Sequence, residues 1–155
     1  REYHRNVQRT MTIRDIELLA PARDLAILVA EDNAVNRLLA VTLLEKRGHA
    51  VTAVENGRQA LEALARQPFD LALLDVRMPE MDGLETTRRI RRSPPPGVDP
   101  RLPVAALTAH ALKGDRERFL AMGMDDYLSK PIDAAELEQV LNRLAKRRAA
   151  RPAGG

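Results

Sequence analysis

The feature that most limits the fold of this chain is a series of short apolar segments of strand length, which alternate with longer segments that suit helices. The first of them, residues 25–30, is apolar at every position, as expected for a strand covered on both faces. Similar strands are predicted at about 50–54, 71–74, 104–107 and 126–128. Helices are predicted between and after them, at about 34–47, 58–66, 82–91, 115–122 and 133–148. Strands and helices that alternate in this way build a parallel sheet with helices on both faces, so the sequence predicts an α/β fold.

Residues that commonly begin or end helices support these boundaries. Asn33 and Asp133 are suited to cap a helix N-terminus, and Asp82, with Glu85 three residues later, resembles a capping box. The three prolines at 94–96 cannot continue a helix, so a loop is expected there.

The length of 155 residues suits a single domain, with a segment at each end that is expected to lie outside it. Residues 1–24 are predicted to be an N-terminal arm or linker with a short helix around 13–19, residues 25–148 the folded domain, and residues 149–155 a disordered basic tail. The last fourteen residues carry five Lys and Arg side chains and no acidic one. Without aromatic residues or a recognition motif these charges do not make a nucleic-acid-binding module, so no nucleic acid partner is expected.

Several classes of protein are disfavoured by what the sequence lacks. It has no cysteine, which excludes disulfides and thiolate metal sites and suits the reducing cytoplasm. No apolar run approaches the about 20 residues that span a bilayer, and no apolar stretch of signal-peptide type follows the N-terminus. The chain is therefore expected to be cytoplasmic and, because it does not begin with Met, to be part of a longer polypeptide.

Polar residues of a particular kind stand where the predicted strands end. Glu31 and Asp32 follow the first strand, Asp75 the third, Thr108 the fourth and Lys130 the fifth. Taken singly, each has an ordinary structural explanation as a turn residue, a strand end or a surface charge. The carboxyl ends of parallel strands, however, meet at one edge of a sheet, where α/β proteins bind their ligands. The five residues are therefore expected to form one site.

Three carboxylates gathered at one edge require a cation. Two unit charges about 4 Å apart repel by about 4 kcal/mol at an effective dielectric constant of about 20. A set of carboxylate oxygens with open positions suits Mg²⁺, which leaves one carboxylate able to attack phosphorus and form an acyl phosphate. Lys130 and Thr108 would then stabilise the charge on the phosphoryl oxygens.

Four segments of the chain resemble the response-regulator receiver family. They read ILVAEDN at 27–33, DVRMPEMDG at 75–83, ALTA at 106–109 and YLSKP at 127–131. The resemblance covers about residues 25–145, with the motifs in the family's order and spacing. It implies a flavodoxin-like three-layer sandwich, in which five helices cover a five-stranded parallel sheet of order 2-1-3-4-5.

The resemblance also implies a role for each residue at the strand ends. Asp75 is expected to be the phosphoacceptor. Mg²⁺ is expected to bind Glu31, Asp32, Asp75 and the main-chain carbonyl of Arg77. Lys130 is expected to contact the phosphoryl group.

Two further residues and a partner follow from the same resemblance. Thr108 and Tyr127 look like the hydroxyl and aromatic pair that reports phosphorylation to the surface around the last strands. The sequence EDN at 31–33 followed by NR at 36–37 is most like the receivers of hybrid sensor histidine kinases. The expected partner is a histidine kinase or a histidine phosphotransfer domain, and the sequence does not indicate an oligomeric state.

The first predicted helix carries more apolar side chains than one buried face can hold. Eight of its first eleven residues, from 34 to 44, are apolar, and the polar ones form no face of their own. Leu39 and Leu43 are predicted to face the core, so some of Val35, Leu38 and Val41 must face solvent or the neighbouring helix. A phosphohistidine-bearing helical bundle could dock on this exposed part, with contacts from the residues Val35, Asn36, Pro131 and Ile132.

Alternative functions remain open from the residues alone. A phosphatase of the haloacid-dehalogenase type would need an acid two residues after Asp75, where Arg77 cannot give up a proton. A flavin-binding module would place a phosphate against Glu31 and Asp32, which repel it. With no ATP-binding motif, the chain itself is expected to be an acceptor domain and not an enzyme. It would belong to a hybrid histidine kinase or, alternatively, act as a free-standing single-domain regulator.

Overall fold

A computed structural model of the 155-residue chain describes residue 12, residues 24–109 and residues 113–149. Its strands are β1 (Ala26–Ala30), β2 (Ala50–Val54), β3 (Leu71–Asp75), β4 (Val104–Thr108) and β5 (Asp126–Ser129). Its helices are α3 (Ala34–Lys46), α4 (Gly57–Arg66), α5 (Gly83–Arg92), α6 (Lys113–Ala121) and α7 (Ala134–Ala149). The short helix predicted around 13–19 and most of the predicted tail lie outside the described residues.

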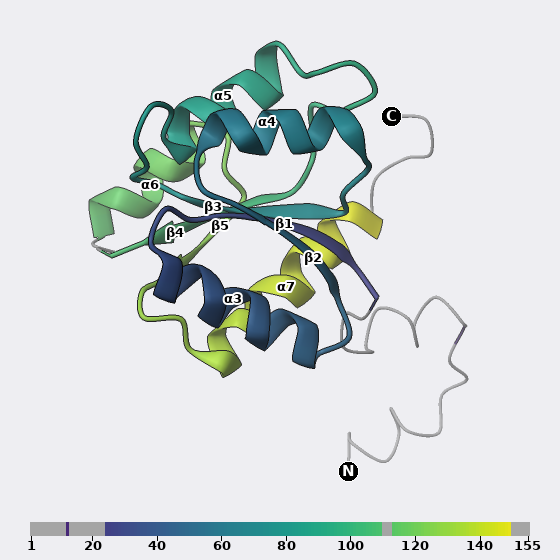
Figure 1. Ribbon diagram of the computed structural model, residues 1–155, viewed down its shortest axis with the longest axis vertical. Helices are drawn as coiled ribbons and strands as arrows, with labels where there is room; N and C mark the ends of the chain where they lie inside the picture. Colours follow the sequence, from purple (N-terminus) through teal and green to yellow (C-terminus); the bar gives the residue numbers. More distant parts are fainter. Residues whose placement is uncertain (1–11, 13–23, 110–112, 150–155) are drawn as a thin grey trace.

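The five strands form one parallel sheet in the order β2-β1-β3-β4-β5, which confirms the predicted fold class. Figure 1 shows helices α3 and α7 on one face of the sheet and helices α4, α5 and α6 on the other. The chain reverses its direction of winding between β2 and β3, which lie on opposite sides of β1. Ligands of such sheets bind beside this reversal, at the carboxyl ends of the strands.

The core consists of two layers, one on each face of the sheet. Along β1, Ile27 and Val29 pack with α3 and α7, while Leu28 and Ala30 pack with α4 and α5. All four are fully buried. Because alternate side chains of a strand point to opposite faces, only an uninterrupted apolar strand can serve both layers. This double burial explains the apolar run from which the fold was predicted.

Helix caps set the starts of the helices near the predicted positions. The amides of Asn36 and Glu85 donate to the side chains of Asn33 and Asp82, at 3.0 and 2.8 Å. A further cap, Asn56 at the start of α4, was not predicted. Helix α6 begins two residues before the predicted position, and β5 extends one residue beyond it.

The predicted core face of α3 was wrong by one residue. Ala40 and Leu44 are fully buried, whereas Leu39 and Leu43 are only partly buried. A helix that is apolar on nearly every side carries little information about which side faces the sheet, so packing decides it. The sequence predicted that some of Val35, Leu38 and Val41 would face solvent or the neighbouring helix, and two of them face solvent, since Val35 is 75% and Leu38 is 67% exposed.

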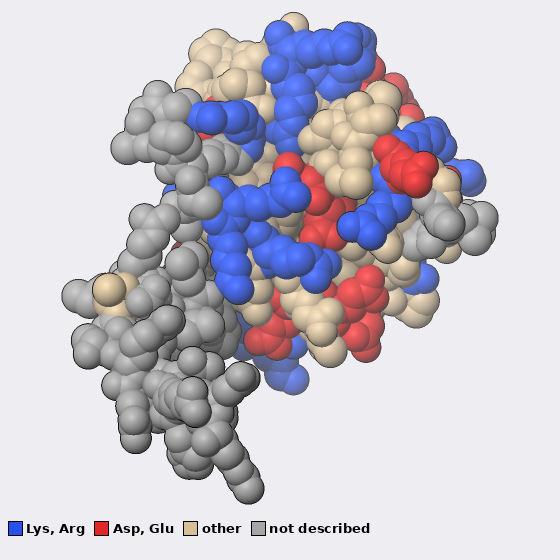
Figure 2. Space-filling model, turned by 180° about the vertical axis from the view of Figure 1, so that it is seen from behind, with Lys and Arg blue, Asp and Glu red and all other residues tan. Residues whose placement is uncertain are grey.

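Three arginine side chains in the described part of α7 are paired with acidic ones. The ion pairs are Arg143–Asp126 at 2.7 Å, Arg147–Asp125 at 3.2 Å and Arg148–Asp70 at 2.8 Å. Figure 2 shows basic and acidic side chains interspersed over the face that it displays. Among the described residues, no helix is long and apolar enough to cross a membrane.

Candidate functional site

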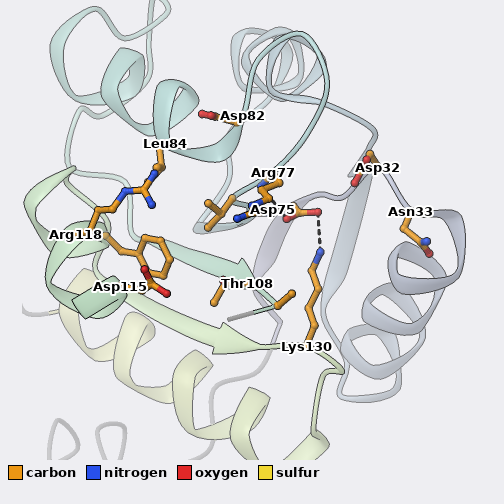
Figure 3. Close-up of a pocket in the computed structure, with 13 residues that line it drawn as sticks. Asp32, Asn33, Asp75, Arg77, Asp82, Leu84, Thr108, Asp115, Arg118 and Lys130 are labelled. Atoms are coloured by element: carbon orange, nitrogen blue, oxygen red, sulfur yellow. Dashed lines mark hydrogen bonds and ion pairs between the residues drawn. The ribbon is translucent and has the colours of Figure 1, made fainter. Parts of the chain in front are cut away.

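The residues predicted from the strand ends do come together at one edge of the sheet. Figure 3 shows Asp32, Asp75, Thr108 and Lys130 around one hollow. Asp75 and Thr108 are the last residues of β3 and β4, and Asp32 and Lys130 follow β1 and β5. The hollow encloses about 450 Å³ and is open to solvent. Asp75 is 3% exposed, while Asp32 is exposed at the rim. Parallel pairing of neighbouring strands brings these distant segments to the same edge.

The carboxylates form a cluster of the size that a single cation requires. Ligand oxygens of Glu31, Asp32 and Asp75 all lie within 4.8 Å of one another. Two oxygens on opposite sides of an octahedral Mg²⁺ lie about 4.2 Å apart, so only small side-chain movements separate this cluster from a binding geometry. The three predicted acidic ligands can therefore hold one metal ion.

Lys130 bridges two of these carboxylates. Its Nζ lies 2.7 Å from Asp75 Oδ2, to which it donates a hydrogen bond, and 2.7 Å from Glu31 Oε1. Burial by itself lowers the pKa of Lys130, but the hydrogen bonds with Asp75 and Glu31 outweigh it, so the pKa is raised. Lys130 therefore stays charged, and the three carboxylates with this ammonium carry a net charge of −2. A divalent cation neutralises that charge.

The turn after β3 is folded back onto Asp75. The amide of Arg77 donates to Asp75 Oδ1 at 3.1 Å, so the main chain of Arg77 lies close to this carboxylate. The Arg77 side chain is exposed and lines the hollow. With Oδ1 bound to this amide and Oδ2 to Lys130, the orientation of the Asp75 carboxylate is fixed.

A glycine that the sequence interpretation missed lets α5 approach this turn. A Cβ on Gly83 would lie 2.3 Å from the main-chain oxygen of Asp75 and 3.0 Å from its carbonyl carbon. No Cβ fits at such distances from backbone atoms, so only glycine allows this packing. Its position directly after Asp82 in the DVRMPEMDG segment was the available signal.

Thr108 and Tyr127 lie on the same face of the sheet but do not share the hollow. Thr108 lines the hollow and is 7% exposed. Tyr127 pairs with Ala106, two residues before Thr108, and packs against the core on the side of α4 and α5. The two side chains are thus diagonal neighbours on adjacent strands. Their predicted role as a switch stays a prediction.

The four predicted docking residues differ in accessibility. Val35 and Pro131 are exposed, Asn36 is half-buried, and Ile132 packs partly against the core between α3 and α7. Less of Ile132 is therefore available to a partner than the sequence suggested. Leu38, one turn after Val35, offers a further exposed apolar side chain.

Two curated relatives of this chain are histidine kinases. The chain is 47% identical over 115 residues to the sensor histidine kinase GacS of Pseudomonas protegens. This alignment covers 74% of the chain and 12% of GacS. The chain is 39% identical over 119 residues to the histidine-protein kinase BarA of Escherichia coli, covering 77% of this chain and 13% of the relative. The chain thus spans only about an eighth of these curated relatives.

A solved structure and a family model match most of the domain. The receiver domain of the sensor histidine kinase PA1611 from Pseudomonas aeruginosa, solved with a magnesium ion in its active-site cleft, is 43% identical and superposes with a TM-score of 0.71. The match covers 79% of this chain and 98% of that domain. Residues 27–142 match the model of the response regulator receiver domain. The motifs, the strand order and the acidic cluster agree with this match, and the chain belongs to the response regulator receiver family.

Proposed function

We propose that this domain accepts a phosphoryl group from a phosphohistidine onto Asp75, with Mg²⁺ bound by Glu31, Asp32, Asp75 and the main-chain carbonyl of Arg77. The observation that carries the proposal is the Asp75 carboxylate, buried among two other carboxylates and held by Lys130 at 2.7 Å. The magnesium ion in the PA1611 receiver, which is 43% identical, supports the choice of metal.

The side chains of the site supply the rest of the chemistry. An oxygen of Asp75 attacks phosphorus, the bond from phosphorus to the imidazole nitrogen breaks, and the imidazole leaves with the electron pair. When bound, Mg²⁺ neutralises the charge on the phosphoryl oxygens and orients them. Lys130 turns its ammonium from Asp75 towards the same oxygens, and the Thr108 hydroxyl donates a hydrogen bond to one of them. An acyl phosphate on Asp75 is the product.

The partner in this proposal is a histidine kinase or a histidine phosphotransfer domain that docks beside the hollow. Val35 and Leu38 expose apolar surface on the first turns of α3, next to Asn33 at the rim of the site. Pro131 directly follows Lys130 and is exposed as well. A helical bundle that presents a phosphohistidine could cover these residues and bring its phosphorus to Asp75.

The similarity to GacS and BarA favours a place within a hybrid histidine kinase, and a free-standing regulator is the alternative. In either case the domain acts as the acceptor and is not by itself an enzyme. An Asp-nucleophile phosphatase is disfavoured because Arg77, two residues after Asp75, cannot serve as a general acid.

The test is phosphorylation by a small acyl phosphate, followed by mass spectrometry of the intact protein. Wild type should gain one phosphoryl group in the presence of Mg²⁺ and none in excess chelator. Asp75→Asn should gain none under either condition. Phosphorylation of that variant, or of wild type without metal, would contradict the proposal.

A further inference from the structure

The turn that carries Glu31 and Asp32 is held from behind by an arginine. Arg37, on the first turn of α3, donates from Nη1 to the main-chain oxygen of Glu31 at 2.9 Å and to that of Asp32 at 3.4 Å. Its side chain is only 22% exposed. The bonds reach the backbone of two of the three residues whose carboxylates form the acidic cluster. Arg37 itself contacts neither of these carboxylates in the described interactions.

A second contact links the same guanidinium to the end of β2. Nη2 of Arg37 lies 3.6 Å from Oε1 of Glu55, the residue after that strand. The amide of Glu31 also donates to the main-chain oxygen of Val54, at 3.0 Å. Arg37 thus ties the turn after β1 to α3 and to the end of β2. The Glu55 carboxylate offsets part of the charge of Arg37.

Arg37 can influence a bound cation in two opposite ways. Its positive charge repels Mg²⁺, so loss of the charge alone would strengthen binding. Its hydrogen bonds hold the backbone of two ligand residues, so loss of the bonds would weaken binding. The charge is partly solvated and is paired with Glu55, which reduces the repulsion. The hydrogen bond to the Glu31 main-chain oxygen is short, at 2.9 Å, and partly buried, so the second effect should exceed the first.

We infer that Arg37 is a positioning residue for the metal site: it fixes the turn after β1 so that Glu31 and Asp32 present their carboxylates to Mg²⁺. The inference rests on the proposed function, because it takes these residues as magnesium ligands. Glu55 assists by orienting Arg37 and by offsetting its charge.

The experiment measures Mg²⁺ affinity by isothermal titration calorimetry at fixed ionic strength, in wild type, Arg37→Gln and Arg37→Lys. Arg37→Gln should raise the dissociation constant for Mg²⁺ about tenfold. Removal of a residue that orients a metal ligand typically lowers metal affinity by about 10- to 100-fold, and we expect the lower end of that range. Arg37→Lys keeps one donor group and the charge, so it should recover part of the affinity. In phosphorylation by a small acyl phosphate, Arg37→Gln should raise the half-saturating Mg²⁺ concentration and leave the rate at saturating Mg²⁺ within about twofold.

Arg47→Gln is the matched control. Arg47 lies just after the other end of α3, donates to the main-chain oxygens of Leu43 and Ala134, and faces Glu138 at 3.8 Å. Its exposed fraction is 26%, close to that of Arg37. Arg47→Gln should lower the thermal stability somewhat, because it removes the hydrogen bond between the end of α3 and the start of α7. Its affinity for Mg²⁺ should equal that of wild type.

The inference depends on whether Arg37→Gln weakens Mg²⁺ binding. Unchanged or tighter Mg²⁺ binding in a folded Arg37→Gln variant would overturn it, and so would equal weakening in Arg47→Gln. A lower maximal rate with unchanged half-saturation would also overturn it. If wild type bound no Mg²⁺, or if Asp32→Asn left binding unchanged, the proposed function itself would fail, which separates the two cases.

Discussion

The exposed apolar surface at the start of α3 offers the sharpest test of how a partner delivers its phosphoryl group. Val35 is 75% exposed and Leu38 is 67% exposed, although both are large and apolar. Complete burial of such a side chain contributes roughly 1.5–3 kcal/mol, so the exposed part of Val35 can contribute roughly 1–2 kcal/mol to docking. An aspartate in its place loses this contribution and must also be desolvated.

We therefore expect Val35→Asp to slow phosphotransfer from a phosphohistidine partner at least about tenfold, equivalent to about 1.4 kcal/mol. Leu38→Asp should have a similar effect. Leu38 is a better second position than Ile132, because Ile132 packs partly against the core and its substitution would also disturb the fold. Leu120→Asp is the control, since Leu120 is a 44% exposed leucine on α6, on the other face of the sheet.

The assay compares two phosphodonors at concentrations below saturation. One donor is a purified histidine phosphotransfer domain carrying a radiolabelled phosphohistidine, and the other is a small acyl phosphate. The α3 variants should be slow with the first donor and nearly normal with the second, which needs only the metal site. Equal slowing with both donors would mean a damaged fold, and normal rates with both would remove α3 from docking. Equal slowing by Leu120→Asp would show that the effect is not specific to this surface.

Three further predictions concern the turn after β3, the core and the lifetime of the product. Gly83→Ala should destabilise the domain by several kcal/mol in urea denaturation, because the alanine Cβ would lie 2.3 Å from the Asp75 main-chain oxygen. Gly114→Ala is the control, since a Cβ there meets nothing within 4 Å. Burial lowers the pKa of His49, whose Nδ1 accepts a hydrogen bond from the amide of Leu25 at 3.2 Å. The contribution of neutral His49 to the free energy of unfolding is therefore complete above about pH 6.5, the pKa of the ring in the unfolded chain. This contribution falls as the pH drops from there towards the lower pKa of the ring in the folded protein. His49→Gln should flatten this part of the curve of unfolding free energy against pH, and an equally steep curve would contradict the assignment. Arg77 lines the hollow beside Asp75, whereas His110 lies outside the described residues. The double variant Arg77→Ala, His110→Ala should change the half-life of the acyl phosphate several-fold, measured by loss of radiolabel. An unchanged half-life would mean that neither side chain takes part in hydrolysis.

The sequence by itself determined the elements and the residue types of the site. Uninterrupted apolar runs of strand length, such as residues 25–30, are typical of strands covered on both faces, and their alternation with helical segments predicted the layered α/β fold. The carboxyl ends of parallel strands lie at one edge of a sheet, so Glu31, Asp32 and Asp75 could be expected in one site from the sequence, and their ligand oxygens do lie within 4.8 Å of one another. The strand order came from the resemblance to the receiver family and not from the pattern.

Only the tertiary structure decided how these elements face one another. Helix α3 is apolar on nearly every side, so its sequence could not show that Ala40 and Leu44, and not Leu39 and Leu43, meet the sheet. The contact of Arg37 with the backbone of the turn after β1 depends on how α3 is packed against β1 and β2. Lys130 reaches Asp75 across 55 positions of the chain, and Gly83 is needed because α5 lies against the Asp75 carbonyl. Periodicity records which side of an element is apolar, whereas contacts between distant segments depend on the packing of the whole domain.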